Sequence, residues 1–248
     1  MGRFRLERGS LMALPDALDA LGSLGAMARY TDEVPTAAIV GSEARAQDFD
    51  ADFALVNRSL RPRHRTVLDG VRAGPLTTPV ELVRLGDLYF VRDGHHRVSA
   101  ARSLGIDRLP ANVVRYCTVA YALCCLRAEH LHSKAAERRF LERLPVPSEF
   151  ARDFWLDKPA DWARLADAAQ AWGYRSGLDG SCTAHDLAAA WWLAEVRPVV
   201  QKLRERGYGQ DLRDVQVFVA ALGARDRLGA LDWPDGLDLS LPCCRRDG

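Results

Sequence analysis

The chain has 248 residues, of which 48% are apolar and 27% charged, proportions that are typical of a globular protein and exclude bulk disorder. Its 34 Lys and Arg nearly balance its 33 Asp and Glu, so the formal charge of +1 excludes a basic field over the whole chain, as many nucleic-acid binders carry. No stretch approaches the roughly 18 uncharged residues of a membrane span, and the cysteines form no evenly spaced framework. We therefore expect a cytoplasmic protein with reduced thiols and no membrane partner.

Residues 1–35 are predicted to form an N-terminal helical arm. Apolar side chains recur there at helical spacing, and Pro15 and several glycines weaken the pattern. The leucines that carry this prediction are Leu11, Leu14, Leu18, Leu21 and Leu24.

Residues 36–117 are predicted to form a compact α+β domain. β-prone runs, a Gly-Asp turn and a glycine that stops a helix set the order strand, hairpin, helix, strand. The segments are a strand over 36–40, a hairpin over 79–92 with its turn at Gly86-Asp87, a helix from Gly94 to Leu104 and a strand over 111–116.

Residues 118–248 are predicted to form an all-helical domain of four or five helices. Long segments rich in Ala, Leu, Trp and Arg are separated there by proline and glycine. Spacing such as Trp162, Leu165, Ala169 and Trp172 indicates core packing rather than a ligand cage. The tail from Trp233 onward is expected to be poorly ordered.

The step from an apolar run through Asp93-Gly94 into a helix is the most informative feature of the sequence. The free N–H groups of a helix's first turn and the positive end of its dipole favour a bound phosphate or carboxylate. His95 and His96 add imidazole donors, and Arg97 adds a guanidinium that suits a phosphate. Asp93 is a candidate for capping the helix, for orienting an imidazole or for binding Mg²⁺ beside phosphates.

The segment 91–105 resembles the signature of the ParB/sulfiredoxin superfamily, Gly-x-x-Arg-x-x-Ala at the start of a helix. Gly94, Arg97 and Ala100 match that signature. The five residues 93–97, Asp-Gly-His-His-Arg, are most similar to the Asp-Gly-His-Thr-Arg of the free serine kinase branch and differ only at His96. The likeness covers roughly residues 36–117.

The resemblance implies a nucleotide-binding domain of ParB/sulfiredoxin type that holds ATP, ADP or CTP, with Mg²⁺. Its kinase branch further implies transfer of a phosphoryl group to a small hydroxyl substrate. The implied roles are phosphate binding for Gly94, His95, His96, Arg97 and Ser99, and catalysis for Glu43, Asp93 and His95. Two polar residues near the first strand have alternative interpretations. Glu43 is alternatively a helix-capping or surface acid. Arg45 is alternatively a surface partner of Asp48 or Asp50 instead of a second phosphate clamp.

Two departures from the family pattern argue against particular activities of the superfamily. His95 stands where the sulfiredoxin motif has its nucleophilic cysteine, which argues against reduction of a cysteine sulfinate. No Glu-Asn pair follows Val114, which argues against the CTP gating of the partition proteins.

The rival class is a nucleotide-gated DNA-binding or regulatory protein without turnover. The basic cluster Arg58–Arg65 is the candidate DNA contact, but it contains Pro62, which a groove-reading helix would not, and the net charge is near zero. DNA is therefore not favoured. A third alternative is an interaction scaffold in which Asp93-Gly94 is an ordinary capped turn with two solvated histidines. A homodimer is a candidate assembly in every case.

Overall fold

The computed structural model describes residues 11–74, 76–151, 154–178, 182–227, 229 and 233. The chain divides into two compact units, Met1–Arg138 and Arg139–Gly248, and each is described by itself. The first unit extends past the boundary predicted at residue 117. Backbone bonds explain this, because Ala120 N–H donates to Leu21 O and Asp87 N–H donates to Ala122 O, each at 2.9 Å.

The first unit is built on one mixed six-stranded sheet in the order β1-β3-β5-β4-β6-β2. Pairing is parallel for β1/β3, β3/β5 and β4/β6 and antiparallel for β4/β5 and β2/β6. The strands are β1 (Met12–Ala13), β2 (Ser23–Pro35), β3 (Ile39–Ser42), β4 (Val80–Leu85), β5 (Leu88–Asp93) and β6 (Arg108–Thr118). A mixed α/β unit is thus present, compatible with the predicted α+β class, and the predicted hairpin and last strand are confirmed.

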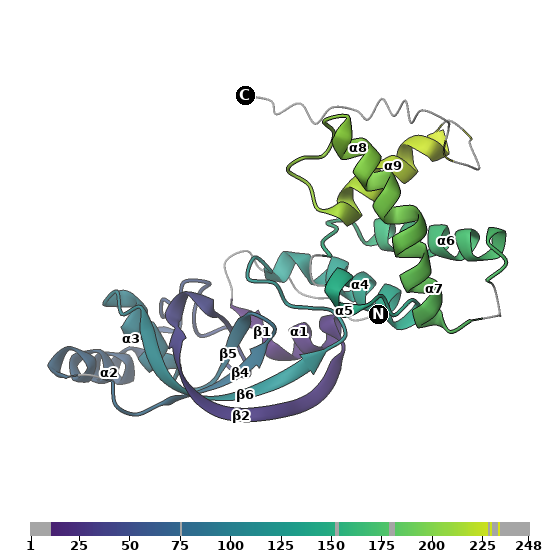
Figure 1. The fold of residues 1–248 in the computed structure, drawn as a ribbon. Helices are drawn as coiled ribbons and strands as arrows, with labels where there is room; N and C mark the ends of the chain where they lie inside the picture. The colour runs from purple at the N-terminus through teal and green to yellow at the C-terminus, as the bar shows by residue number, and fades with distance from the viewer. Residues whose placement is uncertain are drawn as a thin grey trace. The chain divides into compact units, whose positions relative to one another are not determined.

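The predicted N-terminal helical arm is wrong in its second half. A helix, α1 (Leu14–Leu21), ends at Gly22, whose φ of 74° is left-handed, and Gly25 follows with a φ of 100°. From there the chain runs as β2, which pairs with β6 along its whole length; the two form the long curved strands in Figure 1. The leucine spacing that predicted a helix holds only up to Leu21, and Leu24 is 67% exposed.

β2 lies at the edge of the sheet, where unpaired backbone groups invite association with other chains. Side chains form hydrogen bonds with some of the backbone groups along this edge. The Asp32 carboxylate accepts the Glu33 N–H at 2.8 Å, and the Arg108 guanidinium donates to Glu33 O. The edge is therefore partly satisfied within the unit.

One core lies between a face of the sheet and the helix α3 (His95–Ser103). Alternate residues of β4, β5 and β6 reach this core, as expected for a period of two, and β2 and β3 add one residue each. Val98 and Ala101 of α3 complete it. The sheet residues in this core are Val34, Ile39, Val80, Leu82, Tyr89, Val91, Leu109, Ala111 and Val113.

The basic segment predicted from its charge lies on a helix. Residues Arg58–Leu60 form a 3₁₀ turn and α2 (Arg61–Ala73) follows, with Pro62 in its first turn and no buried residue. A proline is tolerated at that position because the first N–H groups of a helix have no helical acceptor. Pro62, the sequence argument against a groove-reading helix, therefore does not prevent a helix from forming here.

The second unit is helical over its described residues, and α4 begins in the first unit. The helices are α4 (Leu131–Arg143), α5 (Ser148–Ala151), α6 (Pro159–Arg175), α7 (Ala184–Trp191), α8 (Arg197–Glu205) and α9 (Asp214–Arg227). Trp162, Leu165 and Ala169 of α6 are buried, which confirms the prediction of core packing for these three residues, whereas Trp172 is half-buried. All residues after Trp233, where the tail was expected to be poorly ordered, lie outside the described residues.

α7 and α8 are joined by a π-helical turn, Trp192–Val196. Pro198 has no N–H to continue the regular ladder, and its ring clashes with the carbonyl four residues earlier, which accounts for a local change of register. Within this turn Glu195 is buried, and its Oε1 accepts from Trp233 Nε1 at 2.8 Å.

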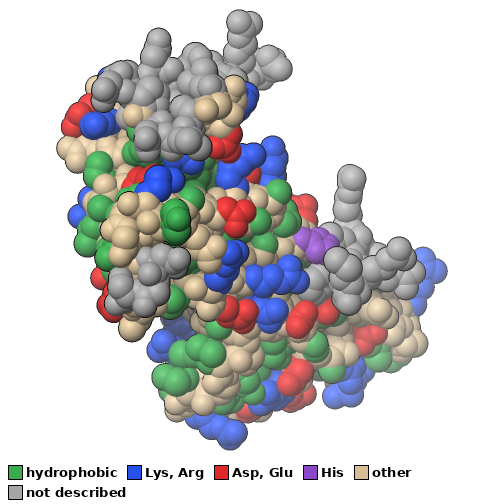
Figure 2. Space-filling model, turned by 90° about the vertical axis from the view of Figure 1, so that its right-hand side faces the viewer, with side chains coloured by type: hydrophobic (Ala, Val, Ile, Leu, Met, Phe, Trp, Pro, Cys, Tyr) green, Lys and Arg blue, Asp and Glu red, His purple; other side chains and the backbone are tan. Residues whose placement is uncertain are grey.

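Basic and acidic side chains lie among one another on the face that Figure 2 shows, in keeping with the near-zero net charge. In the described part of the chain, none of the helices is both long enough and apolar enough to cross a membrane.

Gly41 shows how closely the sheet is packed at β3. A Cβ built there would overlap Met12 O of β1 and the Phe90 ring of β5. We predict that Gly41→Ala lowers the free energy of unfolding by about 2 kcal/mol or more, measured by urea denaturation. Gly70→Ala is the control, because a Cβ on this face of α2 meets nothing within 4 Å and alanine favours helix by up to about 1 kcal/mol. Equal stability of Gly41→Ala and the wild type would contradict this packing.

Candidate functional site

The predicted strand, glycine turn and helix are confirmed at residues 88–103. Gly94 has φ 97° and ψ 21°, a left-handed conformation, and its carbonyl accepts the Val98 N–H at 3.0 Å as α3 begins. A Cβ at this position would lie 2.7 Å from Val80 Cγ1. Only glycine therefore fits, and the N–H groups of residues 95–97 begin the helix without acceptors inside it.

His95 is anchored to the end of β3. Its side chain is buried, with Nε2 2.8 Å from Ser42 Oγ, and the Phe49 ring stacks on it with 6.0 Å between ring centroids. Burial, and after it the charge of Arg45, lowers the pKa of His95 to about 4. The imidazole is therefore neutral at neutral pH.

His96 is the least satisfied buried side chain of this region. It is only 6% exposed, and neither ring nitrogen has a hydrogen-bond partner among the described residues. Its ring lies between Phe49 and His64, each 5.6 Å away between centroids. A buried polar group without a partner is costly, so His96 is a candidate for contact with a ligand.

Three basic side chains act on His96, and the Asp48 carboxylate acts against them. Burial lowers the pKa of His96 first, and the charges of His64, Arg63 and Arg45 lower it further. These groups come from α2 and from the loop after β3, which converge on the start of α3. A cationic surrounding of this kind favours an anion and opposes a bare metal cation.

The sequence predicted that Arg97 binds a phosphate, but in the structure its guanidinium forms hydrogen bonds within the protein. Its Nη1 donates to Thr78 O at 2.8 Å and to Pro79 O at 2.7 Å, and its Nη2 donates to Asp93 Oδ2 at 3.1 Å. The guanidinium thus ties α3 to the chain that leads into β4. Both terminal nitrogens are engaged within the protein.

Asp93 does not cap α3 with its side chain, as one interpretation of the sequence expected. No side-chain hydrogen bond caps the helix at Gly94, and the Asp93 carboxylate is 73% exposed and paired with Arg97. Within the described ranges, no group of three or more His, Cys, Asp or Glu side chains is arranged to hold a metal ion. The residues at this turn therefore do not fit a protein-bound Mg²⁺.

The remaining predicted site residues lie near the turn but not in one cluster with it. The Glu43 carboxylate accepts from Arg92 Nε at 2.7 Å and from Arg92 Nη2 at 3.2 Å, so it is paired. Ser99 is buried one turn along α3 from His95. Arg45 Nη1 lies 3.8 Å from Asp48 Oδ2, the predicted alternative to a phosphate clamp, and its charge also lowers the pKa of His95 and His96. The structure brings together Gly94, His95 and His96.

Sequence reasoning missed Ser42, Phe49 and His64 as members of this site. The sequence had marked the end of a β run at Gly41-Ser42 and a basic cluster that includes His64. Nothing local indicated that these segments lie against the start of α3. No feature of the sequence indicated that Phe49 belongs to this site.

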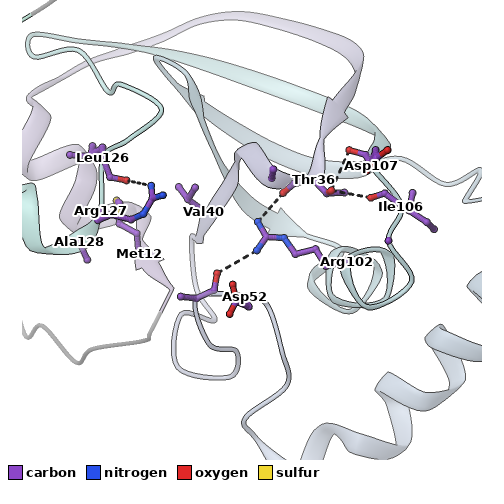
Figure 3. A pocket seen from close by; sticks show the side chains of 13 residues that line it. Met12, Thr36, Val40, Asp52, Arg102, Ile106, Asp107, Leu126, Arg127 and Ala128 are labelled. Carbon is purple, nitrogen blue, oxygen red and sulfur yellow. Dashed lines mark hydrogen bonds between the residues drawn. The ribbon is translucent and has the colours of Figure 1, made fainter. Parts of the chain in front are cut away.

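A separate cavity of about 580 Å³ lies in the first unit, toward the far end of α3. Arg102 lines it and donates to Thr36 O at 2.9 Å, a bond drawn in Figure 3, and also to Ile39 O at 2.7 Å. Arg127 and Asp52 line other walls of the cavity, and no predicted site residue does. Arg102 is half-buried in the cavity wall, and its guanidinium already donates hydrogen bonds to backbone carbonyls.

No model of a known protein family matches this chain, and a comparison with curated proteins also found no match.

The neutral state of His95 makes stability depend on pH. The unfolded chain takes up this proton near pH 6.5 and the folded chain only near pH 4, so the unfolded state binds more protons between these values. We predict that the free energy of unfolding falls by up to about 3 kcal/mol as the pH drops through this window. His95→Gln should remove that part of the slope in urea titrations at several pH values; parallel slopes for both proteins would contradict it.

Proposed function

We propose that the first unit binds a nucleotide through its phosphates at the start of α3. The observation that carries this proposal is the buried His96, whose two ring nitrogens lack partners among the described residues beside the free N–H groups of a helix start. A helix N-terminus is a ready anion site, and an unpaired buried imidazole next to it calls for a polar ligand.

Charge supports an anion of this kind. Arg45, Arg63 and His64 come close enough to depress the pKa of the neighbouring His96. A phosphate placed there would compensate these charges and raise the pKa of both imidazoles. The same surrounding argues against a cationic ligand.

The proposed roles differ from the family pattern at one residue. The N–H groups of residues 95–97 and the rings of His95 and His96 would contact phosphate oxygens. Arg97, which matches the superfamily arginine, would instead hold the turn in shape through Thr78 O and Pro79 O. The proposal keeps a ParB/sulfiredoxin-type domain in the cytoplasm as its framework, on the strength of the motif at Gly94 and the strand, turn and helix around it.

Binding is better supported than phosphoryl transfer. Glu43, the candidate proton acceptor, is paired with Arg92, and the described residues offer no Mg²⁺ site of their own. Mg²⁺ would enter on the nucleotide phosphates, which is its usual manner of binding. Turnover on a small hydroxyl substrate remains a prediction of the resemblance.

The test is a thermal-shift and calorimetry panel with ATP, ADP, CTP and GTP, each with and without Mg²⁺. We predict that at least one nucleotide raises the melting temperature and that His96→Gln weakens its binding about tenfold. His185→Gln is the control, since His185 is exposed on α7 in the second unit. No shift with any nucleotide would contradict the proposal.

The alternative of DNA binding has one observation in its favour. Arg58, Arg61, Arg63 and Arg65 are exposed, and none has an ion pair among the residues that the structure describes. A salt-sensitive gel shift with duplex DNA, together with no response to nucleotides, would favour this alternative over the nucleotide site.

A further inference from the structure

Ser42 links the end of β3 to the candidate site and has no predicted role. It is fully buried, and its Oγ lies 2.8 Å from His95 Nε2. The Arg45 N–H donates to the same oxygen at 2.8 Å. The hydroxyl therefore stands between the backbone of the loop after β3 and the imidazole.

The direction of the Ser42–His95 hydrogen bond follows from counting donors and acceptors. A serine hydroxyl has one proton to donate and two lone pairs. The Arg45 N–H occupies one lone pair, and His95 Nε2 is the acceptor that lies within reach of the Ser42 proton among the described residues. If Nε2 carried the proton instead, the buried Ser42 O–H would have nowhere to donate.

The other ring nitrogen of His95 then carries the ring proton. The imidazole is neutral, because burial holds its pKa near 4, so one nitrogen is a donor and the other an acceptor. His95 Nδ1 has no hydrogen-bond partner among the described residues, yet it is not among the nitrogens sealed from solvent, unlike those of His96. A donor at the first residue of α3 is therefore open to a ligand.

We propose that Ser42 is a positioning residue: its hydroxyl holds His95 in the Nδ1–H tautomer, so that a neutral imidazole presents a hydrogen-bond donor to an anionic ligand at the start of α3. The ligand in this inference depends on the proposed function, whereas the tautomer of His95 does not. With the opposite tautomer, Nδ1 would present a lone pair and repel a phosphate oxygen.

The surroundings make this arrangement rigid. β3 is paired on both sides, to β1 and β5, and the neighbouring strands approach so closely that a Cβ at Gly41 would overlap Met12 O and the Phe90 ring. The Phe49 ring stacks on the imidazole. A ring held on one face and at Nε2 has a fixed direction for Nδ1.

The tautomer is measured directly by ¹⁵N NMR of the histidine rings near neutral pH without ligand, with His95→Gln identifying the His95 signals. We expect Nε2 to resonate as an unprotonated nitrogen and Nδ1 as a protonated one. A wild-type spectrum with a protonated Nε2 overturns the inference, whatever the variants do.

Two variants then test Ser42 itself. Ser42→Ala removes the donor, and we expect His95 to shift toward the Nε2–H tautomer; Ser42→Thr keeps the hydroxyl and should keep the wild-type signals. An unchanged tautomer in Ser42→Ala would overturn the role of the serine.

Titration with ATP separates this inference from the proposed function. If the wild type binds ATP, we expect Ser42→Ala to weaken binding about tenfold and Ser42→Thr to restore most of it. Equal affinity of all three proteins overturns the inference alone. Failure of the wild type to bind any nucleotide, with the expected tautomer intact, overturns the proposed function alone.

Discussion

The left-handed turn at Gly94 is the constraint on which the site depends. With φ at 97° and Val80 Cγ1 directly beside the missing Cβ, the chain reverses within one residue from β5 into α3. That sharp reversal places the first N–H groups of α3 next to the ends of β3 and β5. Arg97 then fixes the turn from the other side, because its guanidinium holds the carbonyls of Thr78 and Pro79 at the start of β4. A left-handed glycine and a half-buried arginine thus hold the same junction.

The two adjacent histidines at this junction are unusual as structural residues. Both are buried, both are held neutral by burial and by nearby arginines, and one has no partner for either nitrogen among the described residues. An apolar pair at these positions would pack against Phe49 without leaving polar atoms unsatisfied. Places where a sequence breaks such a rule are where function is expected, and here the broken rule coincides with a helix start and a cationic surrounding.

Local signals in the sequence predicted the parts of the fold that local chemistry determines. The Gly86-Asp87 hairpin, the turn at Gly94 and the helix after it depend on residues next to one another, and all three were predicted. β2 was missed because the leucine spacing ends at Gly22, where a left-handed glycine stops the helix, and the strand is defined by its pairing with β6. The roles of Arg97, Ser42 and His64 were beyond prediction for the same reason: each depends on a partner that is distant in sequence.

The most direct measurement is the change in backbone amide signals by ¹H–¹⁵N NMR as nucleotide is added to the whole protein. The account predicts the largest changes at the amides of Gly94, His95, His96 and Arg97, where the free N–H groups of α3 begin. Changes centred instead on the cavity around Arg102 and Arg127, or no changes at saturating nucleotide, would contradict it.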